Sequence, residues 1–130
     1  MKISISKRNK VFSIINFYKA HRSEKNLVVF INLDYNGAYC DLDTKEKLYF
    51  NHGICILEHK IAIKNGFIVS GVHTHLIGGI TKHTKYAVIP KNTKYFCGEN
   101  NNIVSEKVII FEKAFVFDEY CRHNDTIFLR

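Results

Sequence analysis

A pair of histidines separated by one residue is the feature of this sequence that most directly suggests chemistry. His73 and His75 lie in the segment Gly71-Val-His-Thr-His-Leu-Ile-Gly-Gly79. On a strand, side chains two residues apart point to the same face, so both imidazoles can approach one metal ion. A metal site needs a third ligand, and His83 is the nearest candidate. One hypothesis is therefore a metal site formed by these three histidines.

The turn that follows the pair decides whether His83 can join it. A two-residue turn at Gly78-Gly79 places His75 opposite Lys82 and sends His83 to the other face of the hairpin. A three-residue loop would instead place His75 opposite His83. The double glycine is typical of the two-residue turn, so we expect a hairpin in which His73 and His75 face solvent or form structural hydrogen bonds.

Two metal-dependent families resemble this part of the chain. His73-Thr-His75 resembles the His-x-His strand of cupins, and Ile89-Pro-Lys-Asn-Thr93 resembles their later Pro-x-Gly-Thr turn. Val72-His-Thr-His75 resembles the core of the JAMM metalloproteases. The acidic ligand of cupins and the downstream serine and aspartate of the JAMM motif are absent at the required spacing. A metal-dependent enzyme using His73 and His75 therefore remains only an alternative.

A longer resemblance covers residues 71–111. The strings Ile-Pro-Lys-Asn-Thr-Lys-Tyr-Phe and Ile-Val-Ser-Glu-Lys-Val-Ile-Ile lie between Tyr86 and Phe111. They are similar to a module of small uncharacterised proteins of Bacteroidetes and their phages, which carry an IPKGTKYY…G…IVSEKIII-like string. The resemblance implies a phage or mobile-element origin. Asn92 stands where those proteins have glycine, an exchange that asparagine tolerates because it also adopts the left-handed conformation.

Other catalytic patterns are missing from the sequence. It contains no phosphate-binding glycine loop, no Gly-x-Ser-x-Gly elbow and no Cys-x-x-Cys pair. The four cysteines, Cys40, Cys55, Cys97 and Cys121, are widely spaced, and we expect free thiols that are mostly buried. We therefore predict a protein that is not an enzyme and needs no cofactor.

The charge of the chain indicates an anionic partner. Nineteen basic residues oppose 12 acidic ones and give a net charge of +7, which attracts nucleic acids and acidic proteins alike. Arginine occurs at only four positions, so sequence-specific reading of DNA is not expected. Tyr95 and Phe96 lie among the basic residues and can stack on bases. The alternative is a solvated basic face above core aromatic residues. The partner-binding candidates are Lys7, Arg8, Lys10, Lys19, Arg22, Lys82, Lys85, Tyr86, Lys91 and Lys94.

The hydrophobic pattern predicts a β-rich α+β domain spanning residues 1–130. An apolar stripe at Val11, Ile14, Ile15 and Tyr18 predicts an amphipathic helix over Lys7–His21. In the rest of the chain, short strand-forming segments separated by turn residues predict an antiparallel sheet that is rolled into a sandwich or partial barrel. We expect the N-terminal helix to pack against this sheet. The predicted strands are Lys2–Ser6, Leu27–Leu33, Ala38–Leu42, Lys47–Phe50, Ile54–Ile63 with a break near Glu58, Phe67–His75, Lys85–Ile89, Lys94–Cys97, Val104–Phe111, Ala114–Phe117 and Thr126–Leu129.

The sequence favours a small, basic, non-enzymatic binding protein of phage or mobile-element origin. Its expected partner is a host protein or nucleoprotein, for example a nucleic-acid-targeting defence nuclease that it inhibits, with non-specific RNA or DNA contact through the basic surface. A virion decoration protein is the second alternative. No apolar run approaches the roughly 20 residues of a membrane span, and no secretion signal is recognisable. We therefore expect the protein in the host cytoplasm.

Overall fold

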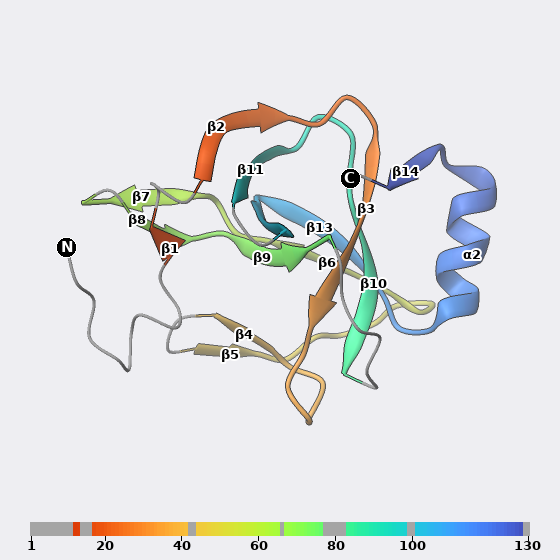
Figure 1. The fold of residues 1–130 in the computed structure, drawn as a ribbon. Coiled ribbons are helices and arrows are strands. Elements are labelled where there is room, and N and C mark those ends of the chain that lie inside the picture. The colour runs from red at the N-terminus through yellow and green to blue at the C-terminus, as the bar shows by residue number, and fades with distance from the viewer. Residues whose placement is uncertain are drawn as a thin grey trace.

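The computed structural model (Figure 1) describes residues 12–13, 17–41, 44–65, 67–76, 83–98 and 101–128. Within them the chain forms a large, mostly antiparallel sheet, two smaller sheets and one helix, which confirms the predicted β-rich class. The main sheet is open and has β2 and β6 at its edges. Its strands, in spatial order, are β2 (Phe17–Arg22), β11 (Lys94–Gly98), β12 (Asn102–Ser105), β9 (Val72–His75), β3 (Asn26–Asn32), β10 (Thr84–Ile89), β13 (Lys107–Phe111) and β6 (Ile54–Glu58).

A ninth strand of the main sheet and several smaller elements complete the fold. Strand β14 (Thr126–Phe128) pairs in parallel with the first residues of β3. Figure 1 shows helix α2 (Ala114–His123) at one side of the molecule and the three-stranded sheet β1–β8–β7 at the opposite side. The bounds of the remaining strands are β1 (Phe12–Ser13), β8 (Phe67–Ser70), β7 (Ala62–Lys64), β4 (Tyr39–Asp41) and β5 (Thr44–Glu46).

The predicted N-terminal helix is wrong wherever its residues are described. Phe12–Ser13 and Phe17–Arg22 are strands, and the rest of the stretch before residue 17, like the predicted strand Lys2–Ser6, lies outside the described residues. Strand β2 pairs antiparallel with β11, from Arg22 opposite Lys94 to Phe17 opposite Gly98. This long-range pairing satisfies the backbone and overrides the weak local preference for a helix.

The helix lies instead where a strand was predicted over Ala114–Phe117. Val116 and Phe117, followed one turn later by Tyr120 and Cys121, form a face that packs on the sheet. Arg122 and His123 in the last turn interact favourably with the helix dipole. The strand prediction used only the first four residues, whose aromatic and β-branched content is typical of strands. The helical spacing of the apolar residues can be recognised only when two full turns are considered.

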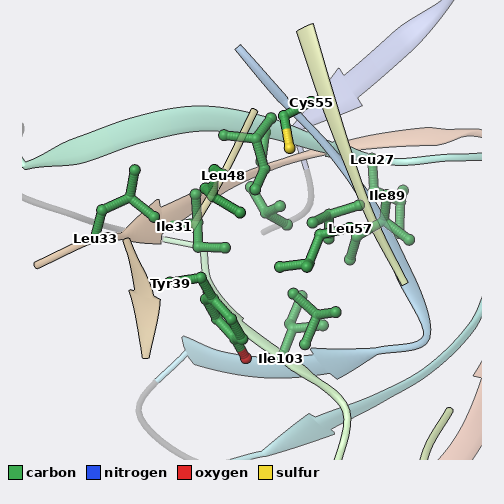
Figure 2. Packing of buried hydrophobic residues seen from close by; sticks show 14 of the residues in the cluster. Leu27, Ile31, Leu33, Tyr39, Leu48, Cys55, Leu57, Ile89 and Ile103 are labelled. Carbon is green, nitrogen blue, oxygen red and sulfur yellow. The ribbon is translucent and has the colours of Figure 1, made fainter. Parts of the chain in front are cut away.

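Strand β3, predicted over Leu27–Leu33, has buried residues on both faces. Leu27, Val29 and Ile31 face the main core, whereas Val28 faces the cluster beneath α2. Figure 2 shows the main core, in which side chains of β3, β6, β10 and β12 converge with Tyr39 and Leu48. Each fully buried aliphatic side chain contributes about 1.5–3 kcal/mol, so this cluster supplies much of the stability. A third cluster beneath β7–β8 contains Ile68, Phe96 and Val104.

Two pairs of successive strands do not form hairpins. The turn around Asn36-Gly37 forms, but β4 then pairs with β5 and not with β3. Strands β9 and β10 do not pair with each other, because β3 lies between them. Three predicted strands also have different limits: Lys47–Phe50 is not a strand, and Phe67–His75 and Val104–Phe111 are each divided, at Gly71 and at Glu106.

In the sheet ladder, strand β9 pairs with β3 through a single residue pair, Phe30 with His75. Beyond this pair, the Tyr39 hydroxyl takes the place of a neighbouring strand. It accepts a hydrogen bond from the His73 amide at 3.0 Å and donates one to the Gly71 carbonyl at 3.2 Å. The Tyr39 side chain is buried in the main core (Figure 2). One side chain thus satisfies the edge of β9 and packs the core.

We expect Tyr39→Phe to lower the free energy of unfolding by about 1–3 kcal/mol, because it keeps the ring but removes the partner of a buried carbonyl. Urea denaturation followed by circular dichroism measures the effect. Tyr35→Phe is the matched control, since Tyr35 is 78% exposed. Equal stability of the two variants would show that the hydroxyl does not hold β9.

Gly71 separates β8 from β9 at a point of close packing. Its φ of +144° disfavours an L side chain, and a Cβ there would lie 2.4 Å from Cγ1 of Val104, which is fully buried. Gly37 also has a positive φ, +80°, but a Cβ there would meet no atom within 4 Å. An alanine at Gly37 would therefore experience backbone strain alone, whereas an alanine at Gly71 would experience both backbone strain and steric overlap.

Gly71→Ala should destabilise the protein by about 2–3 kcal/mol, since backbone strain and overpacking add. Gly37→Ala should cost only about 1 kcal/mol, because strain acts alone. Thermal and urea unfolding of both variants test the difference. If both variants lose the same stability, the close approach to Val104 does not constrain the bend.

Candidate functional site

Two loops at one end of the main sheet are joined through a buried serine. Residues 23–25 connect β2 to β3, and residues 90–93 connect β10 to β11. The Ser23 amide donates to the Thr93 carbonyl at 3.0 Å, and the Asn92 amide donates to the Ser23 carbonyl at 2.7 Å. The Ser23 hydroxyl donates to the Pro90 carbonyl at 2.6 Å and accepts from the Thr93 amide at 2.8 Å. These four hydrogen bonds hold the loops in one arrangement.

Side chains on both sides extend this connection. Asn26 accepts from the Lys91 amide at 2.9 Å and donates to the Asp125 carbonyl at 3.0 Å, which links the loops to the segment before β14. Nη1 of Arg22 donates to the Asn92 carbonyl at 2.8 Å. Asn92 has a φ of +69°, so the left-handed conformation expected for this position is confirmed. The loops are therefore constrained at several points.

Four cations lie on the joined loops or at the strand ends next to them. Arg22, Lys25 and Lys91 are exposed, and Lys94, half-buried, has its Nζ 5.9 Å from the ring centre of Phe96. We call these four residues the basic loop face. Glu24 is the only acidic residue on the two loops, and within the described part of the chain none of the four cations forms an ion pair. The face therefore keeps its charge available for a partner.

A cavity of about 350 Å³ opens beside this face. Its apolar walls come from β3 and β14, and its aromatic walls come from β2 and β11. Its charged residues are the last residue of β2, Arg22, and two residues of the loop that follows. The His21 and Tyr95 rings are stacked, with centroids 5.2 Å apart and planes 26° apart. Burial raises the pKa of the Tyr95 hydroxyl, with further contributions from Cys97 and Glu24, so it stays a donor at neutral pH. We call it the loop cavity; its lining residues are His21, Arg22, Glu24, Lys25, Leu27, Tyr95 and Ile127.

Of the predicted partner-binding residues, the structure brings Arg22, Lys91 and Lys94 together. Lys85 lies at the opposite end of β10 from Lys91, about 20 Å away along the strand, and its Nζ donates to the Glu112 carbonyl at 2.9 Å. The ring of Tyr86 stacks on Phe117 of α2 at 4.4 Å and also contacts Phe30. Lys7, Arg8, Lys10, Lys82 and the side chain of Lys19 lie outside the described residues.

Several residues of this site escaped the sequence analysis. Lys25 and Glu24 lie in a segment recognised only as a polar loop, and Ser23 carries no signal of its own. His21 falls within the stretch predicted as a helix, so its pairing with Tyr95 across β2 and β11 was not foreseen. The clustering of Arg22 and Lys25 within four residues was the one local signal available.

The three histidines of the predicted metal site lie on two different sides of β3. His73 and His75 belong to β9, whereas His83 directly precedes β10 on the other side of β3. The His83 carbonyl accepts a hydrogen bond from the Leu33 amide at 2.8 Å. The His75 ring stacks on Phe30 with centroids 6.3 Å apart. Within the described ranges, no group of three or more His, Cys, Asp or Glu side chains is placed to hold a metal ion.

A second cavity, of about 200 Å³, lies beside the histidine pair. Its lining combines the pair with polar side chains of β3, β4 and β12, and includes the exposed thiol of Cys40. The Cys40 thiol contacts Oδ2 of Asp34 at 3.8 Å. Asp34 itself accepts the Ala38 and Asn36 amides, and these hydrogen bonds hold its pKa below the usual value. The residues around this cavity therefore also serve the turn before β4.

The four cysteines are free, as predicted. Cys55 is buried, Cys97 and Cys121 are half-buried, and Cys40 is exposed. Burial raises the pKa of both Cys55 and Cys97, which disfavours the thiolate that a cysteine nucleophile needs. These two thiols serve as small apolar side chains of the core.

No protein-family model, curated protein or solved structure matches the chain. The similarity of residues 71–111 to Bacteroidetes and phage proteins therefore stays a prediction. The described portion of the chain contains no helix with the length and apolar character needed to cross a membrane. Function has to be argued from the loops and cavities themselves.

Asn92 tests whether the loop geometry depends on the left-handed residue. Asn92→Ala should lower the free energy of unfolding by about 1 kcal/mol, whereas Asn92→Gly should be close to neutral, because only glycine and asparagine adopt this conformation cheaply. Urea denaturation of the two variants measures the difference. A loss of stability in the glycine variant as large as in the alanine variant would contradict this account and assign the role to the asparagine side chain.

Proposed function

We propose that this protein is a small non-enzymatic binding protein that engages a host nucleoprotein through its nucleic-acid strand, using the basic loop face. The observation that carries the proposal is the joining of two cation-bearing loops through Ser23. Lys25 and Lys91 lie on the two loops, and Arg22 and Lys94 lie at the strand ends next to them. Their backbones are held by hydrogen bonds before any partner arrives.

A constrained cluster of cations suits the phosphates of a nucleic acid. Loops that are already ordered lose less conformational entropy on binding than flexible ones. Arg22 uses one guanidinium nitrogen on Asn92, and its other N–H groups remain for a phosphate. Three of the four cations are lysines, which act as point charges and do not read bases bidentately. This composition supports contact with the strand backbone and little sequence preference.

Phage or mobile-element origin and inhibition of a defence nuclease belong to the same proposal. Their support is the resemblance of residues 71–111 together with the small size and positive charge of the chain. A protein that covers the strand of a host nucleoprotein would block access to that strand without any chemistry of its own. We expect it to act in the host cytoplasm.

The two alternatives have less support in the described residues. A virion accessory protein would need a contiguous apolar patch, but the large exposed apolar side chains are distributed over several elements, including Tyr35 in a turn, Ile56 in β6 and Phe115 in α2. A metalloenzyme would need a complete ligand set, and no such set occurs among the described side chains. Scattered exposed apolar residues are normal on soluble surfaces.

We expect the double variant Arg22→Ala/Lys91→Ala to bind single-stranded RNA and DNA about tenfold more weakly than the wild type. The slope of log affinity against log salt should become shallower by about 0.7 for each lost phosphate contact. Fluorescence anisotropy with a labelled 20-nucleotide strand, titrated at low and moderate salt, measures both quantities. The matched control is Lys47→Ala/Lys113→Ala, since both lysines are exposed and Lys113 follows Glu112, which contacts Lys85 at the opposite end of β10 from the loops.

Two results would overturn the proposal. One is a wild-type protein that does not bind either strand at low salt. The other is an equal loss of affinity in the control pair, which would mean that net charge acts without a site. Capture of a nucleic-acid-free acidic protein, with no strand binding, would assign the face to a different partner.

A further inference from the structure

The loop cavity combines three kinds of surface that rarely lie together. Leu27 and Tyr95 are 3% and 9% exposed and form its buried apolar and aromatic part, together with half-buried His21 and Ile127. Arg22, Glu24 and Lys25 are exposed and surround its opening. Its volume of about 350 Å³ falls in the range of about 300–1,000 Å³ that is typical of small-molecule sites.

This combination selects among ligands. A bare anion would gain nothing from the apolar part and would be repelled by the Glu24 carboxylate. A purely apolar ligand would desolvate the charged residues without replacing their hydrogen bonds. A nucleobase satisfies all three surfaces, because its faces stack on aromatic rings and its edge carries N–H donors for a carboxylate. The phosphate attached to the same nucleotide then lies near cations.

The position of the cavity agrees with this assignment. Arg22 and Lys25 belong both to the cavity and to the basic loop face, so a strand lying on that face passes the opening. The stacked His21 and Tyr95 rings come from neighbouring strands β2 and β11, whose pairing places them side by side. Aromatic side chains beside a basic groove are the usual arrangement of proteins that bind single strands.

We propose that the loop cavity receives one nucleobase of a single strand whose phosphates lie on the basic loop face. This inference rests on the proposed function and adds the position of a base to it. Recognition is by stacking and by the polar edge of the base, and the flanking phosphates contact Arg22, Lys25 and Lys91. Duplexes keep their bases stacked inside the helix and cannot use the cavity.

The test compares two strands with the same phosphates, a 12-nucleotide single-stranded DNA and the same length of abasic spacer. We expect the wild type to bind the base-containing strand about tenfold more tightly, as stacking of a base on an aromatic ring implies. His21→Ala, which removes a stacking ring, and Ile127→Trp, which fills the cavity, should bring this ratio close to one. Their affinity for the abasic strand should not change.

Matched controls are His123→Ala and Ile63→Trp, at exposed positions of α2 and β7. Both should keep the wild-type ratio. Circular dichroism melting of each variant confirms that it folds, and a variant that weakens both strands equally would mean that the residue acts only on structure. That outcome in both His21→Ala and Ile127→Trp overturns the inference.

The remaining outcomes separate the two proposals. Equal affinity of the wild type for both strands overturns the base site and leaves the basic loop face intact. Failure to bind either strand overturns the proposed function itself. A free mononucleotide should compete only at much higher concentration, because it reaches fewer cations. If it binds as tightly as the strand, the ligand is a free nucleotide, and the assignment to a strand is wrong.

Discussion

The fold depends on a division of the main sheet between β9 and β3, where only Phe30 and His75 are paired. Because this one ladder pair joins the two halves, they can turn their inner faces toward a common core while remaining one sheet. The division leaves backbone groups to satisfy on both sides. Along β9 the Tyr39 hydroxyl does this, and along the start of β3 the parallel strand β14 does so.

The loop cavity is a consequence of the same division. As β14 pairs with β3, it brings Ile127 toward the side chains of β2 and β11, and the loop cavity lies among these four strands. The loops above it are closed by Ser23, whose hydroxyl and backbone connect two segments far apart in sequence. The outer faces of the two half-sheets are covered separately, by α2 and by β7–β8. The main core and the loop cavity are thus built from some of the same strands.

Local signals predicted what is local in this structure. Strands β10, β11 and β14 and the left-handed Asn92 follow from strand-forming residues and turn chemistry within a few positions. Strand β2 was missed because an apolar stripe fits a helix until β11 is known to lie beside it. The candidate site was predicted only in part. The sequence shows the charges of Arg22, Lys91 and Lys94. It does not show that these residues lie close together, because their proximity depends on contacts between distant segments of the chain.

The connection between Asn26 and Asp125 has a consequence for how the molecule is assembled. The two residues are 99 positions apart, and the pairing of β2 with β11 likewise spans most of the chain. Contacts of such separation close slowly, since chain entropy must be lost before they stabilise anything. During synthesis the ribosome would release the segment that closes the cavity after every other strand of the main sheet. The loop cavity is thus among the last parts of the protein to form.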